Sequence, residues 1–406
     1  MHAMNTPALK ISHGWLIALL GLLVAFGPFA IDMYLPNLPM MGLALHASPE
    51  TMQHTVSAFL VGFCVGMLFY GPLSDRFGRK PLLLSGILLY VVSSLLCALV
   101  NDAQVLVGLR VMQALGGGAA SVMARAIVRD VFQKEDAAHV LSQMALVTMI
   151  APLIAPLLGG WLAGVWGWRS VFILLAMQGL TSAWLVYRYL PETLPDHHKA
   201  AGGLPTVLRH YAALLQDKHN LLLITGLSLP FAGMFAFITG SAFVYIQRFG
   251  VDSRHFGFLF GANIVGQAVF TLWNTRLLKR YPPLSIACAG STIASLAGLL
   301  AVIADTRSLF ALVPCVVVFV GLTIAINANS LATLLGRHQQ QIGAISALAV
   351  SAQFGFGALA SLSVAALQPY SDHAMTLVML ACACGSLAAL LAFRHLTTPL
   401  MPLRHG

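Results

Sequence analysis

Charged side chains are scarce in this sequence. They make up 9% of its 406 residues, whereas apolar residues make up 58%. An average soluble domain is about 25% charged, so these few charges could not cover a water-facing surface of this length. The scarcity excludes an ordinary soluble protein and predicts a chain that is surrounded by a lipid bilayer.

Short segments of alternating polarity, which build membrane β-barrels, are also missing. A barrel strand has about ten residues whose side chains alternate between apolar and polar. The apolar runs here are long and unbroken. Since only helices and closed barrels satisfy every backbone polar group in lipid, the sequence predicts an all-α integral membrane protein.

The patterns that indicate an enzyme are lacking as well. The sequence has no histidine–glutamate metal cluster, nucleophile elbow or phosphate-binding loop. Its six cysteines fall inside apolar runs and have no metal-binding spacing. We therefore expect no metal, no cofactor and no ATP-driven activity. The net charge of +9 follows the topology described below, so nucleic acid is not an expected partner.

Apolar runs of about twenty residues, which are long enough to cross a bilayer, occur repeatedly along the chain. We predict twelve spans, at residues 14–40, 52–73, 81–100, 103–128, 139–163, 167–190, 219–246, 255–277, 283–303, 308–335, 341–367 and 373–395. A polar stretch at 191–218 divides them six and six. The sequence therefore predicts two pseudo-symmetric six-helix halves, 1–190 and 219–406, around a central cavity.

Basic residues are distributed unequally between the two sides. Sixteen lysines and arginines fall in the segments on the side of the N-terminus, and four fall on the other side. Because loops rich in Lys and Arg stay in the cytoplasm, we predict that both termini and the middle stretch are cytoplasmic. Arg125 lies one turn from Arg129 near this end of the fourth span, and we expect its side chain to reach the membrane interface.

The loop between the second and third spans, residues 71–81, reads Gly-Pro-Leu-Ser-Asp-Arg-Phe-Gly-Arg-Lys-Pro. Gly71 and Gly78 permit a tight turn and a close approach of helices. Asp75 can cap a helix end and pair with arginines. We predict a conformational latch made of Gly71, Asp75, Arg76, Gly78, Arg79 and Lys80. The alternative is a plain positive anchor, which would explain the three basic residues but not Asp75 or the glycine spacing.

The fifth span contains Ala-Pro-Leu-Ile-Ala-Pro-Leu-Leu-Gly-Gly at residues 151–160. Pro152 and Pro156 free backbone carbonyls on one helix face and bend the helix. Gly159 and Gly160 allow close packing on a neighbouring helix. An ordinary kinked membrane helix is the alternative interpretation.

Asp32, in the first span, is the only carboxylate that falls inside a span rather than in a loop or at a span end. Burial in a low dielectric favours the protonated form of a lone acid, so Asp32 can bind and release a proton near neutral pH. In the fourth span, Arg110 and Gln113 share a helix face, and Arg110 should face a cavity or a partner. Asp32 and Arg110 each lie about 12 Å from the same membrane face, so they could meet.

Two interpretations of Asp32 remain open at this point. In the first, Asp32 carries protons and Arg110 assists the coupling. In the second, the two form a structural salt bridge that never titrates.

These motifs resemble the major facilitator superfamily. Residues 71–81 are similar to its loop signature, and the Arg110 segment to its fourth-helix motif, whose arginine is implicated in proton coupling. Residues 151–160 are similar to the element of its drug/proton antiporters, although Ala155 stands where that element has glycine. With Asp-Met-Tyr-Leu-Pro at 32–36, the chain resembles the bicyclomycin-resistance branch.

This resemblance implies a monomer in the bacterial inner membrane that exports small drugs in exchange for protons by alternating access. An exporter of one natural metabolite, and an uncoupled facilitator of the same fold, remain alternatives.

A broad apolar cavity with aromatic faces and a few hydrogen-bonding groups would suit such substrates. Its candidate lining residues are Tyr34, Gln113, Phe231, Phe235, Tyr245, Asn263 and Asn327. Lipid contact or helix packing is at least as good an interpretation of each aromatic residue.

Overall fold

The computed structural model describes residues 12–194, 204–305, 308–338 and 341–397. Four basic residues counted above, Lys10, Lys199, Arg307 and Arg404, lie outside this part of the chain, as does the centre of the polar middle stretch.

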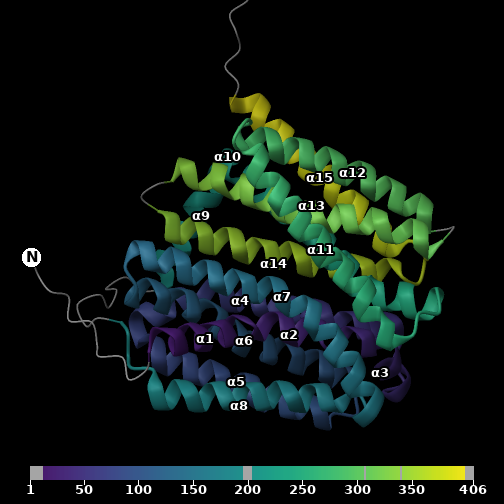
Figure 1. Cartoon of the computed structure of the whole chain (residues 1–406), viewed down its shortest axis with the longest axis horizontal. Helices are drawn as coiled ribbons and strands as arrows, with labels where there is room; N and C mark the ends of the chain where they lie inside the picture. Colours follow the sequence, from purple (N-terminus) through teal and green to yellow (C-terminus); the bar gives the residue numbers. More distant parts are fainter. Residues whose placement is uncertain (1–11, 195–203, 306–307, 339–340, 398–406) are drawn as a thin grey trace, which may run out of the picture.

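Almost all of the described chain is helical (Figure 1). The first half contains α1 (His13–Val24), α2 (Phe26–Asp32), η1 (Leu35–Asn37), α3 (Leu38–Ala44), α4 (Pro49–Phe77), α5 (Arg79–Leu99), α6 (Ala103–Val131), α7 (Lys134–Trp166) and α8 (Arg169–Tyr189). After α9 (Leu204–Gln216), the second half contains α10 (Lys218–Ala242), η3 (Phe243–Arg248), α11 (Ser253–Leu277), α12 (Pro283–Asp305), α13 (Leu309–Arg337), α14 (Ile342–Leu367) and α15 (Ala374–Thr397).

Local sequence fixes where several helices begin and end. The side chains of Ser48, Asp102 and Asp252 accept hydrogen bonds from backbone N–H groups in the first turns of α4, α6 and α11. These groups have no partner within the helix, so a capping side chain stabilises the helix start. Gly78 and Gly167 follow α4 and α7 with φ angles of 96° and 78°, which glycine adopts without steric cost.

The prediction of twelve spans is confirmed, because twelve helical segments in the described chain are long and apolar enough to cross a bilayer. The first differs from the expected continuous helix, since it breaks after Val24 and again after Asp32. Pro36 and Pro39 follow the second break and lack the N–H group that a continuous helix requires.

A further helix, α9, lies in the polar middle stretch and was not predicted. Its buried side chains, Tyr211 and Leu214, lie three residues apart and therefore on one face. The helix contacts α4, α10 and α14. The polar composition of the surrounding residues concealed this short amphipathic segment.

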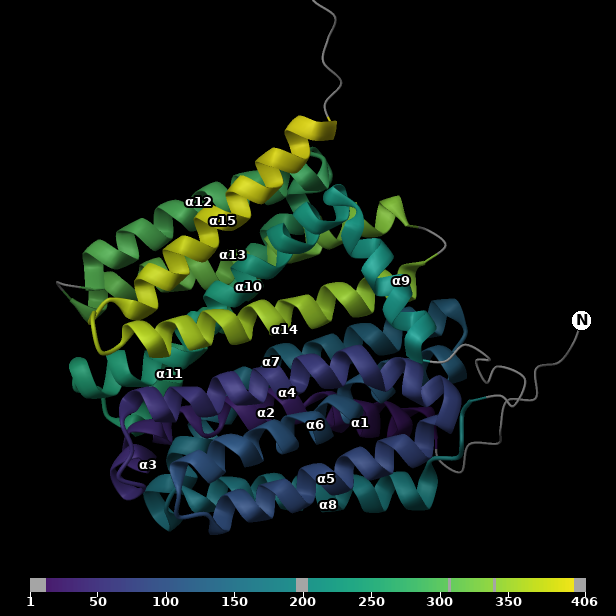
Figure 2. The same cartoon turned by 180° about the vertical axis from the view of Figure 1, so that it is seen from behind.

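The spans form two layers that face each other along the long axis of the molecule. Within the first, α6 packs on α4 and α5, and α5 on α8; within the second, α10 packs on α13, α14 and α15. Figure 1 shows the first layer in purple and blue below the second in green and yellow. The layers meet where α4 contacts α14 and α7 contacts α11, and Figure 2 shows α4 beside α14 from behind.

We call the end of the bundle where α8 finishes and α10 begins the linker end, and the opposite end the far end. Toward the far end, hydrogen bonds join the two halves. The Ser57 and Ser361 hydroxyl groups lie 2.8 Å apart, and Gln53 Nε2 donates to Gln368 Oε1 over 3.4 Å. These pairs hold α4 against α14 on this side of the bundle.

A buried charge cluster also lies at the far end, within the second half. Asp305 ends α12 and is fully buried. Its carboxylate accepts hydrogen bonds from Arg248 at 3.1 Å, from His373 Nδ1 at 3.0 Å and from Thr376 at 3.2 Å. Arg248 also donates to the backbone carbonyl of Asp372. The cluster therefore ties together the end of η3, the end of α12 and the start of α15.

We expect Arg248→Gln to destabilise the protein by about 3 kcal/mol, because it leaves the buried Asp305 charge without its arginine. The double variant Arg248→Gln/Asp305→Asn removes both charges and should recover most of that loss. Thermal unfolding of the purified proteins in detergent measures both effects. A double variant that is less stable than Arg248→Gln alone would contradict this account of the cluster.

Candidate transport cavity

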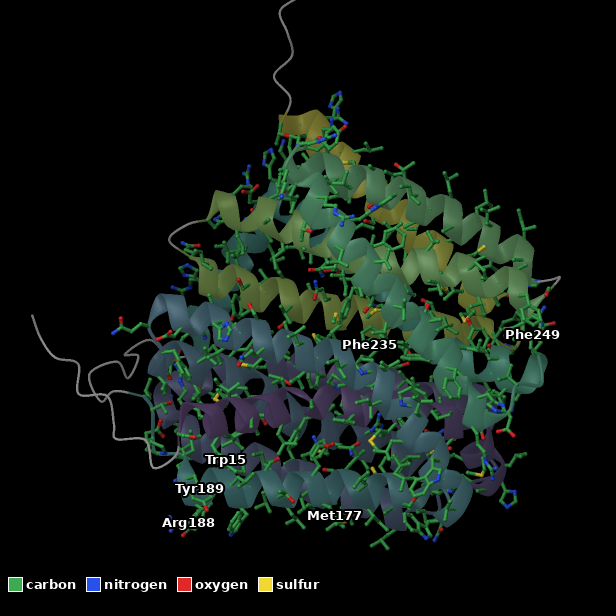
Figure 3. All side chains as sticks on the ribbon, viewed as in Figure 1. Trp15, Met177, Arg188, Tyr189, Phe235 and Phe249 are labelled. Carbon is green, nitrogen blue, oxygen red and sulfur yellow. The ribbon has the colours of Figure 1, made fainter. Side chains whose placement is uncertain are left out.

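A cavity of about 440 Å³ lies between the two halves. It is lined by α1, α2, α4, α6 and α7 of the first half and by α10, α11, α13 and α14 of the second. Figure 3 labels Phe235, one of the lining residues, midway along the bundle and between the two layers, whereas Trp15 and Tyr189 mark the linker end and Phe249 the far end.

Four of the predicted cavity residues line it. They are Phe231, Phe235, Asn263 and Asn327.

Phenylalanine rings meet across the cavity from both halves. Phe354 of α14 lies 4.7 Å, centre to centre, from Phe63 of α4 and 5.3 Å from Phe231 of α10. Phe63 and Phe354 were not singled out from the sequence, because aromatic residues in apolar spans are common and nothing in the pattern separates cavity-facing from lipid-facing ones. The resulting surface is aromatic and broad, as a site for drug-sized molecules requires.

The predictions for Tyr34, Gln113 and Tyr245 are wrong, since none of the three lines the cavity and all are buried in helix contacts. The Tyr34 hydroxyl lies 3.1 Å from that of Thr55. Gln113 donates to Ser94 Oγ over 2.8 Å and accepts from an arginine. Tyr245 packs among phenylalanine rings. Each side chain has a local partner that holds it away from the cavity.

Asp32 lies at the end of α2, where the first span breaks, and its side chain lines the cavity. The residue is only 4% exposed. Its carboxylate has no hydrogen bond or ion pair with any residue that the structure describes. Asp32 is also the only acidic residue among those lining the cavity.

Arg110 does not pair with Asp32, so the expected contact between them is absent from this conformation. Arg110 is fully buried and donates to the backbone carbonyl of Ala30 over 2.9 Å and to Gln113. Its guanidinium lies over the rings of Tyr34 and Phe59, at 4.2 and 4.4 Å from their centres.

The reason for this placement is the break in the first span. The last carbonyl groups of a helix lack intrahelical partners and carry partial negative charge, and the faces of aromatic rings attract cations. Ala30 lies in the last turn of α2. These groups hold the Arg110 guanidinium and leave the Asp32 carboxylate free.

Arg125 was expected to reach the membrane interface, whereas the structure places it among the residues that line the cavity. Its side chain is exposed, but it lines the cavity together with Ser121, which lies one turn earlier on α6. The spacing of four residues between a hydroxyl and an arginine on one face was the sequence signal that could have indicated this.

The proline–glycine segment of α7 lies beside the break in the first span. Pro152 lines the cavity, whereas Pro156, Gly159 and Gly160 do not. The Gly159 backbone touches that of Met33, and a Cβ atom at this position would overlap the Met33 carbonyl oxygen. Asn37 donates to the Gly159 carbonyl over 3.2 Å. Gly159 therefore lets α7 pack directly on the backbone that follows Asp32.

Gly160 faces the other half. A Cβ atom there would lie 3.0 Å from the carbonyl oxygen of Ser253, at the start of α11. Gly159 thus permits the close contact of α7 with Met33 in the first span, and Gly160 permits the close contact of α7 with Ser253 at the start of α11.

The charged loop forms a compact cluster at the linker end, with Arg79 at its centre. Arg79 pairs with Asp75 at 2.6 Å and with Asp130 of α6 at 2.9 Å, and it also bonds to Ser74. Lys80 donates to the Tyr187 carbonyl of α8 over 3.0 Å. These contacts all lie within the first half.

Glu192, just after α8, caps the start of α5 and was missed by the sequence analysis. Its carboxylate accepts from the backbone N–H groups of Arg79 and Lys80 over 2.9 and 3.2 Å. A carboxylate is favourable at a helix N-terminus. Gly78 has a φ of 96°, which side-chain-bearing residues rarely adopt, so glycine is favoured there, and a Cβ atom would also lie 2.6 Å from the Glu192 carboxylate.

Other members of the predicted loop make fewer contacts. The expected close approach at Gly71 is wrong, because it lies inside α4 and a Cβ atom there would meet nothing within 4 Å. The Arg76 guanidinium lies 5.3 Å from the centre of the Phe77 ring.

The sequence pattern of the Major Facilitator Superfamily matches residues 19–362. The chain belongs to this superfamily. It is therefore a multi-pass membrane protein and a secondary transporter rather than an enzyme.

Relatives of known description agree with this assignment. The chain is 32% identical, over 94% of its length and 96% of the relative's, to the bicyclomycin resistance protein homolog of Haemophilus influenzae. It is 33% identical to multidrug resistance protein D of Escherichia coli, over 71% of this chain and 72% of that protein. It is 37% identical to a chloramphenicol resistance protein of Pseudomonas aeruginosa, over 45% of each.

Solved structures share the fold at low sequence identity. The nucleoside transporter NupG superimposes with a TM-score of 0.75 at 14% identity, covering 94% of this chain and all of the other. The xylose transporter XylE of E. coli, in a partially occluded inward-open conformation, superimposes with a TM-score of 0.71 at 16% identity, covering 95% and 97% of the two chains. These likenesses confirm the predicted twelve-helix fold.

We expect Gly159→Ala to destabilise the protein by about 1–3 kcal/mol, because the added methyl group must displace the Met33 backbone. Gly164→Ala is the matched control on the same helix, since its Cβ atom would meet only the Arg254 side chain at 3.5 Å. Thermal unfolding in detergent compares the two. Equal stability of the two variants would contradict the close packing of α7 on the break.

Proposed function

We propose that the protein exports small drugs across the bacterial inner membrane in exchange for protons, as a monomer that works by alternating access. The names of its relatives, which refer to resistance to bicyclomycin, chloramphenicol and multiple drugs, support export of drug-like molecules. The aromatic cavity between the halves supports a substrate of that size.

The observation that carries the proposed proton coupling is the free carboxylate of Asp32. A charged group inside a membrane is unfavourable in free energy unless it is paired. An acid that faces a cavity without a basic partner becomes neutral when it binds a proton, and this removes the unfavourable charge. The position of Arg110 also argues against a permanent salt bridge at Asp32, the alternative that the sequence left open.

The orientation of the chain follows from its basic residues. Since sixteen of them lie on the side of the linker and four on the other, the linker end is cytoplasmic and the far end faces outward. The Ser57–Ser361 and Gln53–Gln368 pairs then close the outer side in this conformation. A drug reaches the cavity from the cytoplasm or the inner leaflet.

In the cycle that we propose, the drug binds to the inward-facing cavity after Asp32 has released its proton to the cytoplasm. The outer pairs between α4 and α14 then separate, and the drug leaves outward. A proton from outside binds to the Asp32 carboxylate and allows the protein to return to the inward-facing conformation. The cluster around Arg79 and Asp75 acts as the latch. Its ion pairs hold the linker end of the first half in one arrangement, and this arrangement must change when the linker ends of the two halves come together.

We expect Asp32→Asn to abolish drug-dependent proton release while leaving the protein folded in the membrane, because the amide cannot exchange a proton. The measurement is proton movement in everted membrane vesicles with an imposed pH gradient, on addition of chloramphenicol or bicyclomycin. Asp102→Asn is the control, since Asp102 lies outside the cavity and asparagine also caps a helix.

Proton release by wild type and by Asp102→Asn, but not by Asp32→Asn, is the expected result. Undiminished release by Asp32→Asn would show that Asp32 is not the carrier. Drug efflux by wild type without proton release would favour the uncoupled facilitator.

A further inference from the structure

Arg125 is the second charged side chain that lines the cavity, and the proton cycle gives it no role. It lies on α6, six residues before the end of that helix at Val131. Its exposed side chain faces the cavity rather than lipid, as does that of Ser121 one turn earlier.

The guanidinium of Arg125 is unpaired within the part of the chain that the structure describes. It makes no hydrogen bond and no ion pair with any residue in the described part of the chain, and the nearby charge that acts on it, that of Arg129, has the same sign. A guanidinium carries five N–H donors and cannot be deprotonated under ordinary conditions. Charged groups at membrane depth that lack a protein partner mark the path of a substrate or ion.

The two charges of the cavity lie at opposite ends of it. Arg110 holds the carbonyl of Ala30, two residues from Asp32, and Arg125 follows Arg110 by fifteen residues along α6. Fifteen residues of an α-helix rise by about 22 Å, so the backbone of Arg125 lies about 22 Å from that of Arg110 along the helix axis. Arginine side chains on a helix point toward its N-terminus, so Arg125 reaches from the linker end toward Asp32. A molecule that enters from the linker end meets Arg125 first.

The other polar groups of the cavity have no net charge. They include the amides of Asn263, Gln267, Asn327 and Gln353, which can both donate and accept hydrogen bonds. Arg125 is therefore the only basic side chain among the described residues that line the cavity.

We infer that Arg125 selects the substrate by its charge. The cavity takes molecules that present a planar hydrogen-bond acceptor or an anionic group, such as a nitro, carbonyl or carboxylate group, and it disfavours cations. The fork of N–H donors on a guanidinium matches such planar acceptors in two parallel hydrogen bonds. This inference names the substrate class of the proposed exporter and rests on that function for the direction of transport.

The charge balance of the cavity is consistent with this class. When Asp32 has lost its proton, the charges of Asp32 and Arg125 cancel, and an uncharged molecule can bond to the Arg125 guanidinium through a planar acceptor; an anionic group is balanced by Arg125 only when Asp32 is protonated. When Asp32 is protonated, the cavity carries one positive charge, which repels a cation.

Equilibrium binding to the purified protein in lipid nanodiscs tests the inference, with tetraphenylborate and tetraphenylphosphonium as probes. The two ions have nearly the same size and shape but opposite charge, and chloramphenicol serves as an uncharged probe with a nitro and an amide group. The variants are Arg125→Gln, Arg125→Lys and, as matched control, Arg129→Gln, which removes a charge one turn away outside the cavity lining.

We expect wild type to prefer the borate, and Arg125→Gln to reduce the ratio of the two affinities at least about tenfold. Arg125→Lys should keep the ratio, because it keeps the charge. Chloramphenicol should bind about tenfold more weakly to Arg125→Gln, through loss of a charge-assisted hydrogen bond. Arg129→Gln should resemble wild type in both respects.

An unchanged ratio in Arg125→Gln, an equal change in Arg129→Gln, a wild-type preference for the phosphonium, or no binding of either ion would overturn the inference. The measurement uses no proton gradient. Failure of proton coupling at Asp32 would therefore leave its result unaffected, and the two proposals can fail separately.

Discussion

The hydrogen bond from Arg110 to the carbonyl of Ala30 keeps the buried arginine of α6 from pairing with Asp32. Arg110 is the fully buried arginine of α6, and it would be the natural counter-ion of the acid in the first span. Because its guanidinium is held by the end of α2 and by the Tyr34 and Phe59 rings, the Asp32 carboxylate forms no ion pair with any of the described residues. An acid in this state is free to exchange a proton with the cavity.

The break that supplies this carbonyl depends in turn on tight backbone packing. Gly159 brings α7 against the Met33 carbonyl, and Asn37 bonds back to α7, so the irregular segment after Asp32 is covered by protein. Irregular backbone at membrane depth is tolerated only where protein or a cavity surrounds it. The proline–glycine segment thus acts on Asp32 through the backbone, and through Pro152 it also forms part of the cavity wall.

The helix pair α4 and α14 carries both part of the aromatic cavity surface and the contacts between the halves near the far end. The proposed substrate surface is built from aromatic rings of both halves, so it would change when the halves move. Phe63 and Phe354, which meet across the halves, belong to α4 and α14, the same helices that are joined near the far end by Ser57 and Ser361. Separation of this helix pair would open the outer side and pull apart the aromatic surface at the same time, which links release of the substrate to the change of access.

The sequence predicted the number of spans, because lipid imposes both length and hydrophobicity on each one. It also pointed to Asp32, because a carboxylate in an apolar span is conspicuous. It did not predict the contacts of Arg110, since these depend on a break whose carbonyl groups cannot be read from side chains. Tyr245 was misplaced because aromatic residues in apolar segments carry no mark of which face lies toward the cavity. Arg125 was misplaced because its nearness to the end of the fourth span was weighed and its four-residue spacing from Ser121 was not. Glu192 was missed because its partners are backbone groups more than a hundred residues away in the chain.

In the proposed cycle, substrate and proton compete through Asp32. The most direct test is the affinity of the purified protein for chloramphenicol as a function of pH, without a membrane gradient. If binding requires the ionised carboxylate, the affinity of wild type should fall by up to about tenfold per pH unit below the pH at which Asp32 takes up its proton, and that of Asp32→Asn should stay constant. An affinity of wild type that does not change between about pH 5 and pH 9, or a pH dependence that persists in Asp32→Asn, would contradict the account.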